Sequence, residues 1–192
     1  YMAICSGIAP LSGYLHGGAN ESVMRMMKHI KKQVHDWEDR DEVKAYLERI
    51  LDGKAYDRSG KIYGMGHAVY TISDPRAVLL KQKAREFARM KNMSHEFALY
   101  DLVEETAKEI FLERRKKHIC ANVDFYSGFV YKLLGIPVEL YTPIFAMSRV
   151  VGWSAHRIEQ IIQNKIMRPA YASSITAQKA YVPLANRGKE AA

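Results

Sequence analysis

The stretch Asn122-Val123-Asp124-Phe125-Tyr126-Ser127-Gly128 joins one carboxylate to an amide, two aromatic side chains and a closing glycine. The apolar residues that follow recur at helical spacing until Gly135-Ile136-Pro137 interrupts the pattern. We therefore predict a helix that begins close to Asp124 and buries Phe125, Phe129 and Leu133. An Asp at a helix start is most often an N-cap, so this stretch alone favours a structural role.

Composition narrows the class of protein. The 192 residues are 48% hydrophobic, which is enough for a packed core in one sizeable domain or two small ones. The formal charge of +8, from 29 basic and 21 acidic side chains, favours nucleic acid, a phosphorylated cofactor or a polycarboxylate as partner, although a solvated basic surface is the commonest explanation. The basic residues are spread over several predicted helices without an aromatic groove, so we expect no nucleic-acid partner.

The cysteine count, the apolar runs and the N-terminal residues bear on metal binding, membrane insertion and cellular location. Cys5 and Cys120 are too few for a disulfide framework or a zinc site, and we predict no metal site. No run of eighteen apolar residues exists and residues 1–15 lack a basic leader, so we expect no membrane partner and a cytoplasmic location. Residues 1–9 resemble the inside of an apolar helix without a cap. We therefore expect a fragment whose missing N-terminal part packs against them.

Spacing and capping residues predict a mostly helical chain. One apolar helix face follows Gly18, at Val23, Met27, Ile30 and Val34. Asp39 and Glu42 resemble a capping box for the next helix, which Gly53 ends. The glycine-rich residues 52–73 are predicted to be loop with room for one short hairpin.

Three more helix starts follow. Asp74-Pro75 predicts a helix to about Met90. Ser94 is expected to cap the next helix, which has the apolar face Leu99, Val103, Thr106 and Ile110. Thr142-Pro143 repeats the cap-and-proline signal, and Pro169 is expected to close that last helix, whose face is Ile144, Ser148, Val151, Ala155, Ile158 and Ile162.

Two His-Gly motifs contain residues that could stabilise an oxyanion or bind an anionic ligand. His16 precedes Gly17-Gly18 and a helix, where a neutral imidazole can donate a hydrogen bond to an oxyanion; the alternative is a simple turn. Gly64-Met65-Gly66-His67 is no dinucleotide fingerprint, because it lacks the third glycine and a surrounding βαβ unit. It could cradle a phosphate or carboxylate.

Two arginines suggest anions nearby. Arg76 opposes the dipole of the helix that it starts, so an anion is expected near it unless it is solvated. Arg149 lies in an apolar helical stretch, where a charge requires either an acidic side chain or an anionic ligand.

Taken together, six motifs in order resemble those of the citrate synthase family, over about residues 1–170. The motifs are Tyr14–Asn20, Gly64–Tyr70, Asp74–Ala77, Asn122–Gly128, Thr142–Arg149 and Asn164–Pro169. The resemblance implies an all-α, multi-helical dimer in which a small domain closes over acetyl-CoA and oxaloacetate. Residues 1–20 would belong to the large domain, residues 21–130 to the small acyl-CoA-binding domain, and residues 131–192 to the large domain and a dimer arm.

The resemblance also implies roles for single residues. Asp124 would remove a methyl proton from acetyl-CoA, His16 would stabilise the enolate, and His67 would hydrogen-bond to and protonate the oxaloacetate carbonyl. Citrate and CoA would then be released, as in the tricarboxylic acid cycle. Arg76 and Arg149 would bind substrate carboxylates, and Arg168 would reach the partner subunit's site.

Acetyl-CoA would be a co-substrate, with no permanently bound cofactor. The loop that contains Ile62, Gly64, Met65 and Gly66 would lie against the CoA adenine. The pantetheine and phosphates would contact Asn122, Arg115 and Lys117.

One departure from the family is visible. Its further oxaloacetate-binding histidine, in an upstream His-Glu-Gly-type motif, is absent from this sequence, so we expect the 192-residue chain to be inactive alone. Two alternatives stay open: a 2-methylcitrate synthase that uses propionyl-CoA, and a non-catalytic CoA-binding or dimerisation module.

Overall fold

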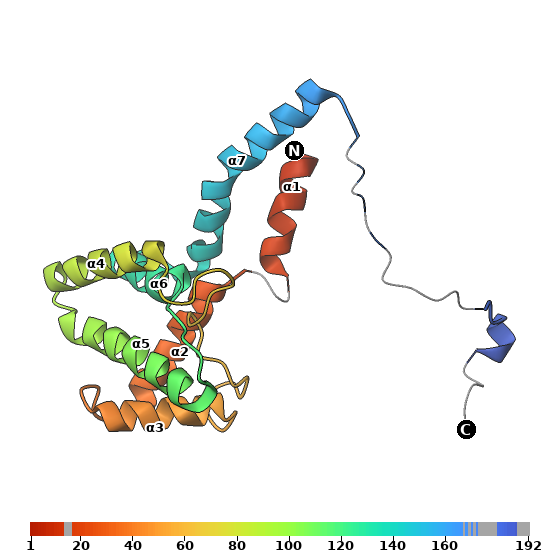
Figure 1. The fold of residues 1–192 in the computed structure, drawn as a ribbon. Coiled ribbons are helices and arrows are strands. Elements are labelled where there is room, and N and C mark those ends of the chain that lie inside the picture. Colours follow the sequence, from red (N-terminus) through yellow and green to blue (C-terminus); the bar gives the residue numbers. More distant parts are fainter. Residues whose placement is uncertain (14–16, 167, 169, 171, 173–179, 188–192) are drawn as a thin grey trace. The chain divides into compact units, whose positions relative to one another are not determined.

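A computed structural model describes residues 1–13, 17–166, 168, 170, 172 and 180–187. In these residues the secondary structure is helical, and the predicted all-α class is confirmed (Figure 1). Residues 1–157 form one compact unit and residues 158–192 a second. The α-helices are α1 (Met2–Ile8), α2 (Ala19–Gln33), α3 (Arg40–Leu51), α4 (Pro75–Met90), α5 (Ser94–Arg115), α6 (Val123–Leu133) and α7 (Tyr141–Gln163), with short 3-10 helices η1 (Ala9–Ser12), η2 (Val138–Leu140) and η3 (Leu184–Asn186).

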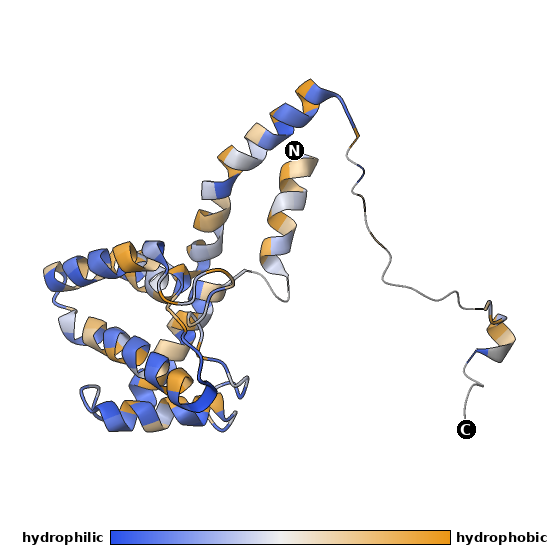
Figure 2. Ribbon diagram, viewed as in Figure 1, coloured by the Kyte–Doolittle hydropathy of each residue, from blue (hydrophilic) through white to orange (hydrophobic). Residues whose placement is uncertain are grey.

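The core of the first unit lies between α2, α3, α5 and α6. Helix α6 packs against α2 and α4, and α5 packs against α3 and α4. The helices carry apolar residues on the inward face and polar residues outside, visible as bands along α3 and α5 in Figure 2. The predicted apolar faces of α2, α5 and α6 are confirmed, since their residues are buried: Val23, Met27, Ile30, Val34, Leu99, Val103, Thr106, Ile110, Phe125, Phe129 and Leu133.

The predicted capping box of α3 is only half correct. The Asp39 carboxylate caps the helix by accepting from the amides of Asp41 and Glu42 at 2.8 and 3.1 Å. The Glu42 carboxylate does not return the bond to Asp39. It accepts instead from the amides of His35 and Asp36, which lie beyond the end of α2. Glu42 therefore supports the turn between two helices as well as the start of α3.

Two helix starts and one loop also differ from the prediction. Ser94 is the first residue of α5, whose N-cap is Met93 without a side-chain cap. Helix α7 starts at Tyr141, directly after η2, so Thr142 lies inside it. Within the described residues, the loop at 52–73 contains no hairpin: Met65 pairs instead with Ala121, in one antiparallel bridge.

Helix α7 ends before the residue that was predicted to close it. The helix ends at Gln163, and Asn164 follows with a left-handed φ of +47°. Pro169, the predicted closing residue, lies outside the described residues. None of the described helices is both long enough and apolar enough to cross a membrane.

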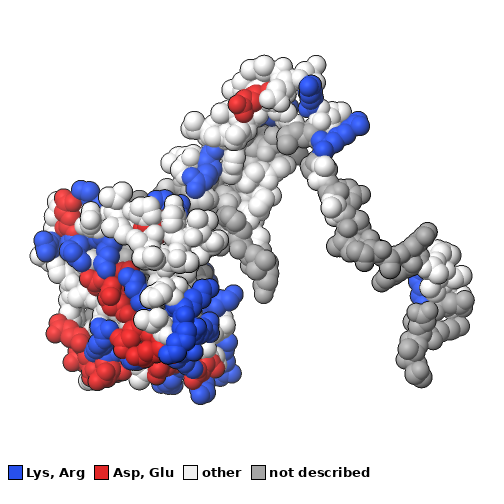
Figure 3. Space-filling view, viewed as in Figure 1, with Lys and Arg blue, Asp and Glu red and all other residues white. Residues whose placement is uncertain are grey.

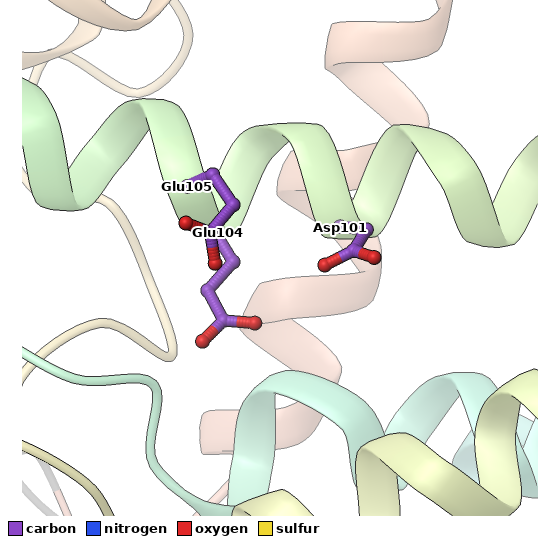
Figure 4. A group of neighbouring side chains, drawn as sticks. All are labelled: Asp101, Glu104 and Glu105. Atoms are coloured by element: carbon purple, nitrogen blue, oxygen red, sulfur yellow. The ribbon is translucent and has the colours of Figure 1, made fainter.

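Three carboxylates on α5 gather at one place beside α4. Atoms of Asp101, Glu104 and Glu105 lie within 4.8 Å of one another (Figure 4). The ammonium group of Lys81 pairs with Asp101 and Glu104, and that of Lys108 pairs with Glu104 and Glu105. Arg85 also pairs with Asp101, at 3.2 Å, so three positive charges stand against the three carboxylates. This cluster is therefore an ion-pair network that ties α4 to α5.

Glu104 is the buried centre of this network, and it predicts an acid-sensitive fold. Burial alone raises the pKa of Glu104, but hydrogen bonds from Lys108, Lys81 and Tyr126 lower it by more, so that the pKa lies below its ordinary value. A carboxyl whose pKa is lower in the folded protein stabilises the fold above the pKa of the unfolded chain, ~4.3. That stability is lost as the pH falls through the folded value.

We expect Glu104→Gln to lower the free energy of unfolding at pH 7 by about 1.5–3 kcal/mol, the scale for a lost hydrogen bond to a charged group. The variant's unfolding midpoint in urea should then depend less on pH between pH 6 and pH 3 than the wild type's. Glu86→Gln, at an exposed pair with Lys83, is the matched control. Parallel loss of stability in wild type and Glu104→Gln would contradict this prediction.

Candidate functional site

Asp124 lies in the first turn of α6, two residues after the N-cap. The N-cap is Asn122, whose side-chain oxygen accepts from the Asp124 amide at 3.0 Å. The structural role that the sequence favoured for Asp124 therefore belongs to its neighbour. The half-buried Asp124 carboxylate stands where the positive end of a helix dipole stabilises an anion.

A pocket of about 170 Å³ opens beside Asp124. Elements distant in sequence border it: the end of η1 and the starts of α2, α6 and α7. The bordering residues are Leu11, Gly17, Gly18, Ala19, Asn20, Asp124, Tyr141, Thr142 and Phe145. The wall is mostly apolar, with Asp124 as its carboxylate, an arrangement typical of a site that binds a small organic ligand.

Glycine is required at the α2 side of this pocket. Gly17 has φ +92°, and a Cβ built there would lie 1.5 Å from the backbone oxygen of Leu11. Gly18 is the N-cap of α2, also with a left-handed φ of +68°. His16 lies outside the described residues, and the chain places it directly before Gly17. Its role therefore stays a prediction.

The ring of His67 is held in one orientation. Its Nδ1 accepts from the amides of Val69 and Tyr70 at 2.9 and 3.0 Å, so in the neutral imidazole the proton is on Nε2. Nε2 lies 3.1 Å from Arg76 Nη2 and 3.9 Å from Asp74 Oδ2. Arg76 Nη2 and the protonated Nε2 are both donors, so this contact does not use the Nε2 hydrogen. His67 therefore has an N–H available to a carbonyl oxygen.

Arg76 is oriented by a buried carboxylate. Asp74, 1% exposed, caps α4 through the Arg76 amide and accepts from Arg76 Nε and Nη2 at 3.0 and 2.9 Å. These hydrogen bonds hold the pKa of Asp74 below its ordinary value, although burial opposes the shift. The anion expected near Arg76 is thus Asp74. The Arg76 side chain is still 55% exposed, which leaves guanidinium donors available to a ligand.

His67, Arg76 and Asp124 belong to one neighbourhood. The loop of His67 is joined to the segment before α6 by two backbone hydrogen bonds, from Gly66 to Cys120 at 2.7 Å and from Asn122 to Gly64 at 2.9 Å. Hydrogen bonds with Asp74 raise the pKa of Arg76 most, and the Asp124 carboxylate contributes a smaller rise. Three of the residues predicted for the site are therefore brought together here.

The two other arginines predicted for the site are both exposed. Arg149 is exposed, with its guanidinium 4.5 Å from the centre of the Phe145 ring, and its binding of an anionic ligand stays a prediction. Phe145 itself borders the pocket. Arg168 is exposed and belongs to the second unit.

The residues predicted to contact CoA differ in how far they are buried. The Ile62 side chain is buried in the core, and Gly64, Met65 and Gly66 are half-buried in the bridged loop. Arg115 and Lys117 are exposed at the end of α5. Their contacts with CoA stay predictions.

Arg115 also borders a second pocket. This pocket has about 190 Å³ and is formed by Leu51, Ile110, Phe111, Arg114 and Arg115. Across the face drawn in Figure 3, basic side chains are interspersed with acidic ones. Ion pairs such as Arg114–Asp52 and Lys44–Glu113 link the two kinds.

Comparisons with known proteins identify relatives of this chain. A protein-family model for the citrate synthase C-terminal domain matches residues 1–170. The citrate synthase of Acidithiobacillus ferridurans is 39% identical over 187 residues, which cover 97% of this chain and 45% of the relative. The 2-methylcitrate synthase of Shewanella oneidensis is 35% identical, with the same coverage of both chains.

A solved structure is also similar. It is a ternary complex of citrate synthase from Thermoplasma acidophilum with carboxymethyl coenzyme A and oxaloacetate. Its TM-score is 0.64 at 32% identity, over 95% of this chain and 46% of that one. The chain thus spans about half the length of the relatives that it matches.

Proposed function

Because the chain belongs to the citrate synthase family, we propose that it serves the condensation of acetyl-CoA with oxaloacetate and the hydrolysis of the product to citrate and CoA. The observation that carries the proposal is the pairing of a carboxylate with an oriented N–H donor. Asp124 and His67 come from segments that are hydrogen-bonded to each other, and Asp124 borders a pocket.

In the first step, Asp124 accepts a proton from the acetyl methyl group. The electron pair of the broken C–H bond moves toward the thioester carbonyl and forms an enolate. A carboxylate of pKa ~4 is a weak base for this proton, so the step requires a donor to the developing oxyanion and a site that excludes water. We assign the donor role to His16, at the glycine-rich start of α2.

In the second step, the methylene carbon attacks the keto carbon of oxaloacetate. His67 Nε2 donates its proton to the keto oxygen, which becomes the hydroxyl group of the product. Water then cleaves the thioester, so that the acyl group becomes a carboxylate and CoA leaves as the thiol. Arg76 and Arg149 would bind the two carboxylates of oxaloacetate, since guanidinium forks match carboxylate geometry.

The ligands of the Thermoplasma structure support this substrate pair, because that complex holds a CoA derivative and oxaloacetate. A homodimer in which Arg168 reaches the partner's site, a cytoplasmic location and the absence of a permanently bound cofactor complete the proposal. The 192-residue chain is expected to show no turnover by itself, because it spans about half the length of its relatives.

A second candidate is the condensation of propionyl-CoA to 2-methylcitrate. The similarity to the Shewanella 2-methylcitrate synthase favours it, at 35% identity over 97% of the chain. Both reactions need the same base and donors, so the residues near Asp124 described above suit either one.

The test is the release of CoA thiol by the full-length protein that carries these residues, with and without oxaloacetate. Acetyl-CoA and propionyl-CoA are compared at equal concentration. We expect oxaloacetate-dependent release, faster from acetyl-CoA. Faster release from propionyl-CoA would favour the second candidate, whereas release from neither would contradict both and leave a binding module.

A further inference from the structure

We infer that Asn122 is a positioning residue, which holds the His67 loop and the Asp124 carboxylate in one fixed relation. This inference rests on the proposed function for its consequence in turnover. It differs from the CoA contact that the sequence suggested for Asn122, because here the amide acts through the protein backbone.

Three hydrogen bonds carry the inference. The Asn122 side-chain oxygen accepts from the Asp124 amide at 3.0 Å, and its side-chain nitrogen donates to the Gly66 backbone oxygen at 2.9 Å. The Asn122 backbone amide donates to the Gly64 backbone oxygen, also at 2.9 Å. One residue therefore contacts the base's helix on one side and, on the other, the residue directly before His67.

The chemistry of the side chain explains why an amide suits this position. A carboxamide offers an acceptor and a donor about 2 Å apart, so it can cap a helix and bind a carbonyl at once. Ser, Thr or Asp would also cap α6, but an ionised Asp has no donor, and Ser or Thr has a single polar atom, which cannot occupy the capping position and the position of the Asn122 side-chain nitrogen at once. The tether is thus separable from the cap by substitution.

The two glycines of the His67 loop that Asn122 contacts differ in how tightly they are packed. A Cβ built on Gly64 would lie 2.8 Å from side-chain atoms of both Phe125 and Val23, so the loop packs tightly on α6 and α2. Gly66 has open space around its Cα, with nothing within 4 Å of a built Cβ. The tether from Asn122 therefore acts at the loosely packed residue, next to His67.

Both polar groups of the Asn122 side chain already form hydrogen bonds within the protein, which argues against a contact with CoA as the main role. A bound pantetheine would have to compete with the Gly66 oxygen for the side-chain nitrogen.

The positioning role and the CoA-binding role predict different changes in kcat and KM. A lost tether misplaces the reacting groups and lowers kcat, whereas a lost CoA contact raises the KM for acyl-CoA.

The experiment compares Asn122→Ser, which keeps the cap and loses the tether, with Asn122→Ala, which loses both. In the full-length protein we expect Asn122→Ser to melt close to the wild type, with kcat reduced ~10–100-fold and the KM for acyl-CoA changed by less than about twofold. Asn122→Ala should lose as much kcat and also melt at a lower temperature. An unchanged kcat in Asn122→Ser, or a raised KM at unchanged kcat, would overturn the inference.

A second readout is independent of turnover. In the 192-residue chain, amide hydrogen exchange at Val69 and Tyr70 should be faster in Asn122→Ser than in the wild type, while the Asp124 amide stays protected. Equal exchange at Val69 and Tyr70 would count against the tether. If the wild-type protein fails to condense its substrates but this exchange pattern is found, the proposed function falls and the positioning role of Asn122 stands.

Discussion

Asp124→Asn is expected to reduce kcat at least ~100-fold, the scale of a lost acid–base group, and to leave the fold intact. The asparagine amide has nearly the same shape as the carboxylate but cannot accept the methyl proton. Helix α6 keeps its N-cap at Asn122, and the lost interaction of the carboxylate with the helix dipole is expected to cost about 0.3–1 kcal/mol. The measurement pairs steady-state kinetics in the full-length protein with a thermal melt.

Asp41→Asn is the matched control for this substitution. Asp41 occupies the same position in α3, with its amide capped by the Asp39 carboxylate just as the Asp124 amide is capped by Asn122. Asp41 is exposed and lies outside the set of residues that border the Asp124 pocket. We expect the two variants to melt at similar temperatures and to differ only in turnover. A kcat within a few-fold of the wild type in Asp124→Asn would remove Asp124 from the role of base.

Gly64→Ala is expected to lower the free energy of unfolding by about 2–4 kcal/mol, the range for overpacking combined with an unfavourable backbone angle. Gly64 has φ +79°, and its new methyl group would lie 2.8–2.9 Å from Phe125 and Val23. The contacts include the Cα of Phe125, which cannot rotate away. Either α6 moves or the loop moves, so turnover should fall as well.

Gly135→Ala separates the two causes. Gly135 has a similar φ of +75°, but a Cβ built on it has open space around it. The control therefore carries the backbone strain without the clash, and we expect it to cost about 1 kcal/mol. Urea unfolding of both variants in the 192-residue chain measures the difference. Equal midpoints would mean that the loop does not pack on α6 as described.

The helices were predictable because the information that forms them is local. The apolar faces of α2, α5 and α6 follow from the 3.6-residue period, and Asp74-Pro75 marked the start of α4 correctly. Errors occurred where a residue bonds outside its own helix. Glu42 binds amides that precede the helix, and Met65 pairs with Ala121 far along the chain.

For the candidate site, too, the sequence predicted some features and missed others. Resemblance singled out His67, Arg76 and Asp124, and the described structure brings these three together. The contacts that orient them were not predictable from spacing: Asp74 was seen only as a cap, although it also binds the Arg76 guanidinium, and the tether from Asn122 to Gly66 joins separate segments. The exposure of Arg149 depends on packing that no local pattern encodes.

The central claim is that a methyl proton of the acyl group is removed and a carbon–carbon bond then forms. Its most direct test supplies the full-length protein with oxaloacetate and acetyl-CoA whose methyl group carries three deuterium atoms, and analyses the products by mass spectrometry. The account predicts citrate that retains two of the three deuterium atoms, with little citrate formed by Asp124→Asn in the same time. Acetate that keeps all three deuterium atoms, released without citrate, would show simple thioester hydrolysis and would contradict the account.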